Sequence, residues 1–361
     1  MPAAGDGTLA GHTTLRLGGP ARAFVTATTE DDVIARVRSA DAAGEPLLVL
    51  GGGSNLVVAD EGFPGTVVHV ATTGIDRSGP AGLTVAAGQD WDALVAACVD
   101  EGLAGLECLS GIPGRAGATP IQNVGAYGQE VAGVITSVRV YDRVGGQVRD
   151  LATADCGFGY RSSVFKRSLA PGAVTGRFVV LRVTFTLVAD KLSMPVSYPE
   201  LARVLGLDPG GRAPLAEVRA AVLGLRRRKG MVLDPGDPDT RSVGSFFVNP
   251  VLATGQFAAA GPDVPHYPAG PGELKVPAAW LIERAGFGKG YRHPGGARIS
   301  AKHTLALVNP GGASTASLLA LAAEIRDTVR GRFGVELACE PVLAGTSLPG
   351  PATGRGLAAG R

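Results

Sequence analysis

Hydrophobic and polar positions along the first 190 residues predict short strands that alternate with helices. Short apolar runs rich in Val and Leu are typical of buried strands. Helices are predicted at 30–43, where Thr29 is the N-cap and acidic residues fill the first turn, and at 91–101, where Asp90 is the N-cap. The expected strands are 23–27, 47–50, 56–58, 67–70, 83–86, 134–141 and 178–188.

The pattern changes after Ala189, which suggests a second domain. Apolar residues at helical spacing predict a helix at 215–229, and shorter patterns predict helices at 278–285 and 317–330 and strands at 305–308 and 335–343. The end of the chain is rich in Gly, Pro and Ala, which is typical of a flexible segment. We therefore divide the chain into domains at 12–188 and 189–345 and a flexible tail at 346–361.

Composition narrows the class of protein. The chain has 361 residues with 54 Gly and 25 Pro, but 45% hydrophobic residues argue against disorder. A net charge of +2 and a longest basic run of four residues (226–229) argue against a nucleic-acid partner. With no apolar stretch near the roughly 20 residues of a membrane span and no signal-peptide pattern, we expect a cytoplasmic protein. Its Cys and His spacings predict no metal site.

The first glycine-rich segment, 51–55, reads Gly-Gly-Gly-Ser-Asn between two predicted strands. Bare backbone N–H groups with Ser54 and Asn55 beside them suit a phosphate or pyrophosphate. The segment lacks the Lys-Ser/Thr of a P-loop and the following helix of a Rossmann turn. An ordinary glycine-rich turn is the equally weighted alternative.

The second glycine-rich segment, 110–128, is long for a loop without regular structure, and such loops are usually functional or disordered. Its apolar residues Ile112, Ile121 and Val124 favour burial over disorder. Gln122 and Asn123 both donate and accept hydrogen bonds, as recognition of a planar heterocycle requires. The alternative is a structural crossover loop.

Two further segments contain residues that could take part in catalysis or binding, Arg161 and Ser245. Arg161 stands among aromatic and small residues and could clamp a carboxylate, although the segment alone favours a surface arginine. Ser245 stands between Gly244 and two phenylalanines, outside any nucleophile-elbow pattern, so a turn or cap role is the stronger interpretation of that segment alone.

Glu340 lies inside the predicted strand 335–343, where a buried carboxylate needs a partner or a raised pKa. Alternation along a strand would put Glu340 on the same face as Glu336, opposite Val335 and Leu337. A solvated position at a sheet edge is therefore an equal alternative.

The segments 51–55, 112–128 and 244–250, in this order, resemble the UDP-N-acetylenolpyruvoylglucosamine reductase family. The resemblance implies an α+β protein. A PCMH-type FAD-binding fold of two α+β lobes would occupy 12–188, and a smaller α+β substrate-binding domain would occupy 189–345.

The resemblance also implies a function. Family members are flavoenzymes that reduce the enolpyruvyl ether of UDP-N-acetylglucosamine enolpyruvate to UDP-N-acetylmuramate in peptidoglycan precursor synthesis, and so serve cell wall biogenesis, cell shape and cell division. FAD would be bound non-covalently and NADPH would donate hydride. The expected partners are these small molecules, with no nucleic acid and no membrane, and the expected state is a monomer.

Residue roles follow from the resemblance position by position. Arg161 and Glu340 would polarise the substrate carboxylate, and Ser245 would deliver a proton, which requires a lysine or arginine close to it. The implied cofactor-binding residues are Gly51, Gly52, Gly53, Ser54, Asn55, Ile112, Pro113, Gly114, Gly117, Thr119, Pro120, Gln122, Asn123, Gly125, Ala126 and Tyr127. The implied substrate-binding residues are Tyr198, Lys229, Asn249, Tyr267, Lys275 and Lys289.

Two other functions compete with this one. A PCMH-type oxidase would favour a covalent link from His or Cys to the flavin, and neither residue occurs in the two glycine-rich loops. A non-catalytic FAD- or nucleotide-binding module would bind flavin without NADPH turnover. One departure from the family pattern is His303, where some relatives carry Gln.

Overall fold

The computed structural model describes residues 7–260 and 263–350, and its first lobe is a parallel three-stranded sheet covered by a helix. The strand order is β1-β4-β2, from Ala21–Ala27, Phe63–Val70 and Leu47–Leu50. Helix α1 (Glu30–Ala42) packs on these strands, and Thr29 caps it by accepting a hydrogen bond from the Asp32 amide at 3.1 Å. The predicted cap and helix are confirmed.

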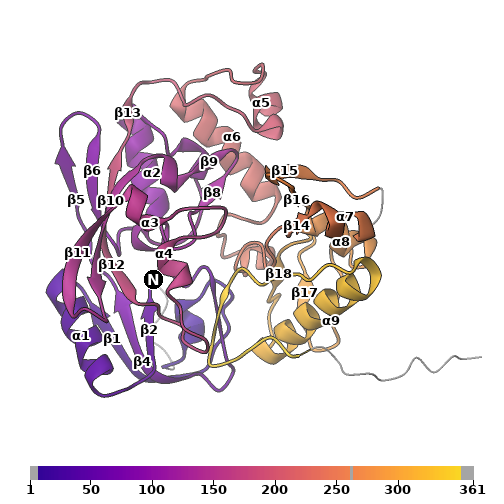
Figure 1. Cartoon of the computed structure of the whole chain (residues 1–361), viewed down its shortest axis with the longest axis horizontal. Helices are drawn as coiled ribbons and strands as arrows, with labels where there is room; N and C mark the ends of the chain where they lie inside the picture. Colours follow the sequence, from indigo (N-terminus) through magenta and orange to yellow (C-terminus); the bar gives the residue numbers. More distant parts are fainter. Residues whose placement is uncertain (1–6, 261–262, 351–361) are drawn as a thin grey trace, which may run out of the picture.

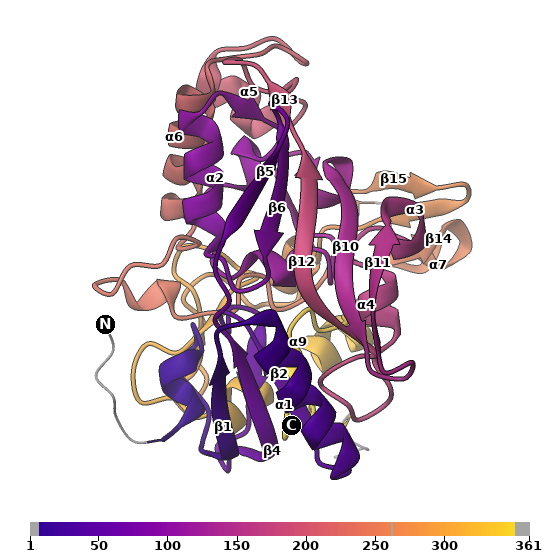
Figure 2. The ribbon, with the colours of Figure 1, turned by 90° about the vertical axis from the view of Figure 1, so that its left-hand side faces the viewer.

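The second lobe is a five-stranded antiparallel sheet in the order β11-β10-β12-β6-β5. These strands are Gln147–Ala152, Ile135–Asp142, Phe178–Thr186, Gly82–Ala86 and Ile75–Ser78. Helix α2 (Trp91–Asp100) begins at its predicted cap, Asp90. One hydrophobic core runs through both lobes and joins Val68 of the first sheet to Val183 of the second sheet and Trp91 of α2. Figure 2 shows the two sheets one above the other.

The C-terminal part has a separate core built around α8 (Ala278–Arg284) and α9 (Thr315–Phe333). Ser314 and Ser317 form a capping box at the start of α9, and Gly334 ends it in the left-handed conformation. A small sheet in the order β14-β16-β15 (Val251–Ala253, Glu273–Lys275, Tyr267–Gly270) carries α7 (Thr254–Ala260). This part lies opposite the two lobes in Figure 1.

The chain returns to its N-terminal part at β19 (Val342–Ala344), which pairs in parallel with β3 (Leu56–Val58). The Asp60 carboxylate also accepts hydrogen bonds from the first amides of α9, Thr315 at 2.7 Å and Ala316 at 2.9 Å. A carboxylate at a helix N-terminus is stabilising. These contacts bring the residues before β19 beside the glycine-rich turn before β3.

Residues 190–230 cross back over the second lobe. Helices α5 (Pro199–Leu205) and α6 (Leu215–Arg228) pack together, and their core includes Cys108. Because this segment packs on the first part of the chain, it forms one wall of the space between the parts. The division at residues 188 and 189 stays a prediction.

The remaining short elements complete the α+β arrangement. They are the strands β7 (Leu103–Ala104), β8 (Gly125–Ala126), β9 (Gln129–Glu130), β13 (Val188–Ala189), β17 (Arg298–Ile299) and β18 (Leu307–Val308), the helices α3 (Thr153–Cys156) and α4 (Val164–Arg167), and the 3₁₀ turns Leu9–His12, Glu107–Leu109, Ala116–Ala118, Val131–Gly133 and Pro238–Thr240.

The predicted strand 335–343 is wrong over most of its length. Only Val342 and Leu343 lie in a strand, and the preceding residues are extended but irregular. They are held by isolated hydrogen bonds, such as Val248 N–H to Ala338 O at 3.1 Å, rather than by a ladder. Of the predicted tail, 351–361 lie outside the described residues, whereas the Pro349 carbonyl accepts a hydrogen bond from Arg326 at 2.7 Å.

Within the described ranges, no helix is both long and apolar enough to cross a membrane.

Candidate active site

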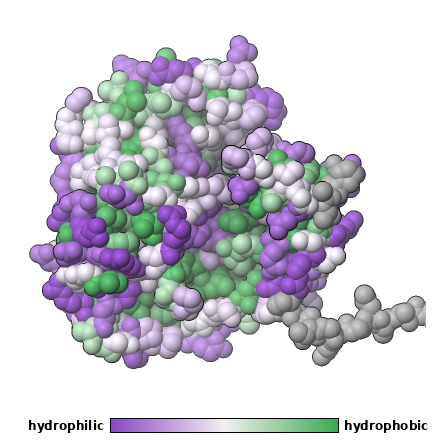
Figure 3. All heavy atoms as spheres, in the orientation of Figure 1, coloured by the Kyte–Doolittle hydropathy of each residue, from purple (hydrophilic) through white to green (hydrophobic). Residues whose placement is uncertain are grey.

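A cavity of about 730 Å³ opens where the two lobes, α6 and the C-terminal part meet. Its wall includes both glycine-rich segments, the end of α6, the Ser245 segment and the residues before β19. In Figure 3 apolar residues gather in a hollow between the N-terminal part and α9. The volume is typical of a site for a small molecule or cofactor.

The two glycine-rich segments pack directly on each other in the cavity wall. A Cβ added to Gly52 would lie 2.9 Å from the Gly114 Cα, so only glycine allows this approach. Ser54 donates a hydrogen bond to the Pro113 carbonyl at 2.9 Å, which ties the segments together. The result is a cradle of bare backbone on one side of the cavity.

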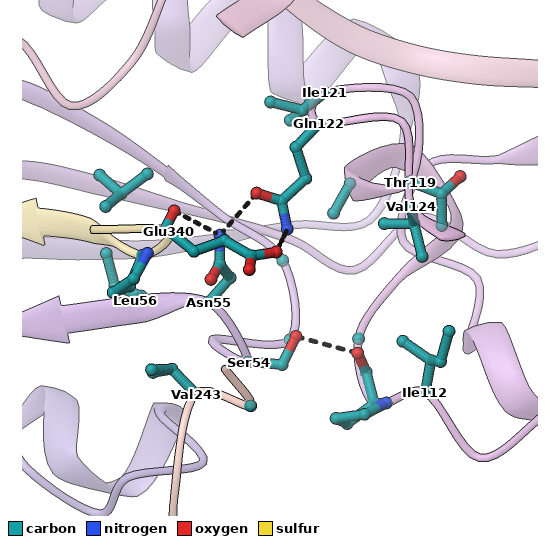
Figure 4. A pocket seen from close by; sticks show the side chains of 18 of the residues that line it. Ser54, Asn55, Leu56, Ile112, Thr119, Ile121, Gln122, Val124, Val243 and Glu340 are labelled. Carbon is teal, nitrogen blue, oxygen red and sulfur yellow. Dashed lines mark hydrogen bonds between the residues drawn. The ribbon is translucent and has the colours of Figure 1, made fainter. Parts of the chain in front are cut away.

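Asn55, Gln122 and Glu340 form a chain of hydrogen bonds across the cavity (Figure 4). The Asn55 amide donates to Gln122 Oε1 at 3.2 Å and to the Glu340 carbonyl at 3.4 Å. Gln122 Nε2 donates in turn to Glu340 Oε1 at 3.3 Å. Because Asn55 occupies the Gln122 oxygen, the Gln122 nitrogen is directed at the carboxylate.

Arg161 reaches the same carboxylate from the opposite side. Its Nε lies 3.2 Å from Glu340 Oε1, and its terminal nitrogens donate to the carbonyls of Asn123 at 3.3 Å and Gly125 at 2.9 Å. Three of the five guanidinium N–H donors are thus used, which leaves two for a ligand. The sequence alone favoured a surface arginine, yet the Arg161 side chain is only 22% exposed.

The Glu340 side chain is 14% exposed and has one free oxygen. Within the described part of the chain, nothing hydrogen-bonds Oε2. Burial raises the pKa of Glu340, while the charges of Arg161 and Lys166 oppose the rise. The alternative of a solvated edge position is therefore wrong. Glu336, expected on the same face, is 58% exposed instead, because no regular strand forms.

Ser245 also lines the cavity, beside the fully buried Phe246 and Phe247. In the part of the chain that the structure describes, no group hydrogen-bonds its hydroxyl. The Phe246 carbonyl accepts a hydrogen bond from the Glu340 amide at 2.9 Å, so the Ser245 and Glu340 segments are directly joined. Lysines and arginines line the same cavity, but none donates a hydrogen bond to Ser245 within these residues.

The predicted substrate residues fall into three groups, of which two line a cavity. Tyr198 and Lys229 line the cavity, where the Lys229 ammonium pairs with Glu200 at 2.6 Å and the Tyr198 ring meets Tyr127 edge to face at 5.4 Å. Asn249 lines a second cavity of about 620 Å³ that shares Arg161 with the first.

Tyr267, Lys275 and Lys289 line neither of the two cavities. Lys275 nevertheless lies close to the site, because its ammonium is 4.8 Å from the centroid of the Tyr160 ring, next to Arg161. Tyr267 is opposite Lys275 in the β15–β16 pair and is 57% exposed. The charge of Lys289 helps to lower the pKa of His303, which lines the cavity.

The predicted cofactor residues surround the cavity with two exceptions, Pro120 and Asn123. Asn123 is 1% exposed, donates to the carboxylate of Glu130 at 2.7 Å and accepts from the Ala132 amide at 3.1 Å. It therefore stabilises the loop from behind rather than facing the cavity. The assignment of the predicted cofactor residues as ligands of a cofactor stays a prediction.

Two cations in the cavity wall, Arg226 and Lys166, escaped the sequence analysis. Arg226 lies one helical turn before Lys229, a predicted substrate-binding residue. This spacing is the sequence feature that could have identified Arg226. Burial lowers the pKa of the Arg226 guanidinium to about 10, and its Nε is buried without a hydrogen-bond partner. Lys166 had no signal beyond its closeness to Arg161 in the sequence. In the described ranges no cluster of three or more metal-ligating side chains occurs.

Comparison with known proteins decides the family. A model of the C-terminal domain of UDP-N-acetylenolpyruvoylglucosamine reductase matches residues 237–344, and an FAD-binding domain model matches 21–152. The UDP-N-acetylenolpyruvoylglucosamine reductase of Thermobifida fusca is 55% identical over 94% of this chain and 97% of its own. The UDP-N-acetylenolpyruvoylglucosamine reductase of Saccharopolyspora erythraea is 56% identical over 95% of this chain and 96% of its own. The chain belongs to the UDP-N-acetylenolpyruvoylglucosamine reductase family.

The crystal structure of a family member from Thermus caldophilus, a UDP-N-acetylenolpyruvylglucosamine reductase, agrees with this assignment. It is 28% identical, covers 93% of this chain and 97% of its own, and gives a TM-score of 0.63. The α+β fold predicted from the sequence is confirmed, and the chain is an FAD-dependent oxidoreductase rather than a non-catalytic binding module.

The residues present fit FAD. The close packing of Gly52 on Gly114 brings two glycine-rich stretches of backbone together in the cavity wall, which suits a pyrophosphate, and the Arg226 Nε, which no described residue hydrogen-bonds, is a buried positive donor of the same wall. Among the described residues, the wall carries one carboxylate, Glu340, and five cations: Arg115, Arg161, Lys166, Arg226 and Lys229. An excess of cations suits an anionic dinucleotide.

The absence of Cys and His from the glycine-rich loops did not settle the mode of flavin attachment, because Cys339 and His303 reach the cavity from elsewhere. Burial raises the pKa of the Cys339 thiol to about 11 and lowers the pKa of His303 to about 4. The thiol is therefore protonated at neutral pH, and a protonated thiol is a weak nucleophile.

Proposed function

We propose that this enzyme reduces the enolpyruvyl ether of UDP-N-acetylglucosamine enolpyruvate to the lactyl ether of UDP-N-acetylmuramate. NADPH is the hydride donor, FAD is bound non-covalently, and the protein acts as a cytoplasmic monomer. The reaction supplies peptidoglycan precursors and so serves cell wall biogenesis, cell shape and cell division. The observation that carries the proposal is that one cation-rich cavity is lined by the Arg161–Glu340 pair and by Ser245, whose hydroxyl is hydrogen-bonded by no described residue.

The substrate carboxylate is bound by Arg161, which Glu340 holds in place. Arg161 has two N–H donors left after its three protein contacts, enough for a bidentate bond to a carboxylate. Glu340 Oε1 lies 3.2 Å from Arg161 Nε and so fixes the direction of the guanidinium. The positive guanidinium polarises the substrate carboxylate and stabilises the negative charge that develops on an enol-like substrate.

Ser245 supplies the proton that completes the reduction. The chemistry that bound FAD contributes is two-electron transfer, by which hydride passes from NADPH to one carbon of the double bond. The Ser245 O–H donates a proton to the adjacent carbon, so that substrate, NADPH and one proton give product and NADP⁺. The cations of the wall offset the charge left on the oxygen.

Both predicted domains contribute binding residues. Gly52 and Gly114 of the FAD-binding domain, 12–188, would hold the FAD pyrophosphate together with Arg226, which comes from the following domain. Lys229 and Tyr198 would bind the substrate diphosphate, with 189–345 as the substrate domain. The shared cavity suggests that NADPH and substrate use it in turn.

The test is an assay of purified, FAD-loaded protein. We expect NADPH oxidation that depends on UDP-N-acetylglucosamine enolpyruvate and a product two hydrogens heavier than this substrate. NADPH oxidation that is indifferent to the enolpyruvyl substrate and consumes oxygen would contradict the proposal. Acid precipitation should release FAD into the supernatant, whereas flavin that stays with the pellet would mean a covalent link.

A further inference from the structure

Arg161 has an unfavourable backbone conformation. Its φ is 50°, in the left-handed region that residues with a Cβ seldom adopt. Gly159 and Ser162 exchange two backbone hydrogen bonds of 3.0 and 3.1 Å around it, which closes a tight turn. This turn directs the guanidinium at Glu340, so the contacts that keep it closed also set the position of the guanidinium.

One of these contacts comes from Lys166, a residue without a role so far. Its ammonium donates a hydrogen bond to the Arg161 carbonyl at 3.2 Å. Lys166 lies in α4, whose N-cap Ser163 accepts from the Lys166 amide at 3.2 Å and donates to the Ile121 carbonyl. Ser163 therefore links α4 to the second glycine-rich loop, and the Lys166 ammonium links α4 to the Arg161 turn.

Lys166 also faces the carboxylate of the site. It lines both cavities, at the place where Arg161 and Cys339 do the same. Its charge and that of Glu340 attract each other, and burial lowers the pKa of the ammonium. In the described ranges the one hydrogen bond of its ammonium is to the Arg161 carbonyl, and no carboxylate is in direct contact with this charge.

We propose that Lys166 is a positioning residue for the Arg161–Glu340 pair. It fixes the Arg161 turn through the carbonyl and supplies a second positive charge to the Glu340 carboxylate. The charged or titratable groups that face Glu340 are Arg161, Lys166 and Tyr160, and Gln122 faces it as a neutral donor. The expected effect of Lys166 on catalysis rests on the proposed function, whereas its expected effect on the pKa of Glu340 does not.

The first test measures Glu340 in the FAD-loaded enzyme without substrate. The carboxyl carbons of ¹³C-labelled glutamates are titrated by NMR, and the Glu340 signal is the one lost in Glu340→Gln. We expect a higher Glu340 pKa in Lys166→Met and Lys166→Gln and a pKa near the wild-type value in Lys166→Arg. Lys191→Met, at an exposed lysine away from the cavities, is the matched control.

The second test separates kcat from KM for the enolpyruvyl substrate. We expect kcat to fall by about tenfold to a hundredfold in Lys166→Met, less in Lys166→Gln, which can still donate to the Arg161 carbonyl, and little in Lys166→Arg. A wild-type Glu340 pKa in both neutral variants, or an arginine variant as impaired as the methionine variant, would overturn the proposal. If Lys166→Met does not fold, the glutamine and arginine variants decide. An enzyme that fails to reduce the enolpyruvyl substrate refutes the proposed function, while the titration still decides about Lys166.

Discussion

Gln122 Nε2 donates a hydrogen bond to Glu340 Oε1 at 3.3 Å, across 218 positions of sequence. Arg161 Nε lies 3.2 Å from the same oxygen, so two donors hold Oε1, while no donor among the described residues reaches Oε2. The carboxylate thereby acquires a fixed orientation relative to the glycine-rich loop. A residue predicted to bind the cofactor thus also sets the geometry of a residue predicted to bind substrate.

Removing the Gln122 donor should impair substrate reduction. A hydrogen bond to a charged group contributes about 1.5–3 kcal/mol, so we expect Gln122→Met to lower kcat for the enolpyruvyl substrate by roughly tenfold to a hundredfold. Steady-state kinetics of the FAD-loaded variant measures this effect. Gln147→Met, at an exposed glutamine of β11, is the control. An unchanged kcat in Gln122→Met would mean that Arg161 alone orients Glu340.

Ser245→Ala should separate the two half-reactions. Proton delivery by a positioned side chain contributes about a hundredfold or more, so product formation should fall by at least that factor. The variant should still reduce its bound flavin with NADPH. A stopped-flow instrument measures this reduction as a loss of flavin absorbance. Because no other group hydrogen-bonds the hydroxyl within the described residues, the fold should tolerate alanine. Loss of both half-reactions would instead make Ser245 a structural residue.

The local part of the fold could be predicted from sequence because local patterns encode it. The N-caps Thr29 and Asp90 identified their helices, and the apolar runs at 47–50 and 178–188 identified buried strands, the second of which ends at Thr186. The segment before β19 misled the same reasoning. Its extended shape comes from isolated bonds to the Ser245 segment, which no period along the chain reveals.

The site could be predicted only as separate motifs. Nothing in the segment around Arg161 shows that Glu340 neutralises it, because their contact depends on β19 pairing with β3. Arg226 is buried by packing of α6 on the second lobe, and Lys166 matters through a turn whose conformation is not encoded in its own side chain. These features depend on tertiary contacts, so the sequence pattern could not predict them.

Gly52→Ala should weaken FAD binding. The added Cβ would lie 2.9 Å from the Gly114 Cα and 3.3 Å from its carbonyl carbon, so the two glycine-rich segments must move apart. We expect the purified variant to contain less FAD per protein, measured from the ratio of flavin to protein absorbance. Gly133→Ala is the control, since Gly133 lies outside the cavity wall and its Cβ would meet no atom within 4 Å. Equal FAD loss in both variants would contradict the close contact as the cause.

His303 should make the folded protein less stable in acid. The Leu305 amide donates to His303 Nδ1 at 3.1 Å, so the folded ring is neutral and carries its proton on Nε2. Burial and the charges of Lys229 and Lys289 lower its pKa from 6.5 to about 4. The unfolded chain therefore takes up this proton first, and stability present above pH 6.5 is lost as the pH falls towards 4, by about 3 kcal/mol in total.

His303→Gln removes the titrating group and can keep both hydrogen-bonding functions at this position. Urea unfolding of the FAD-free protein at several pH values should show a smaller loss of unfolding free energy between pH 6.5 and 4 in the variant than in the wild type. His266→Gln, at an exposed histidine, should leave the wild-type slope unchanged. Parallel slopes for wild type and His303→Gln would mean that His303 titrates alike in the folded and unfolded states, and that the cations of the cavity wall do not act on it.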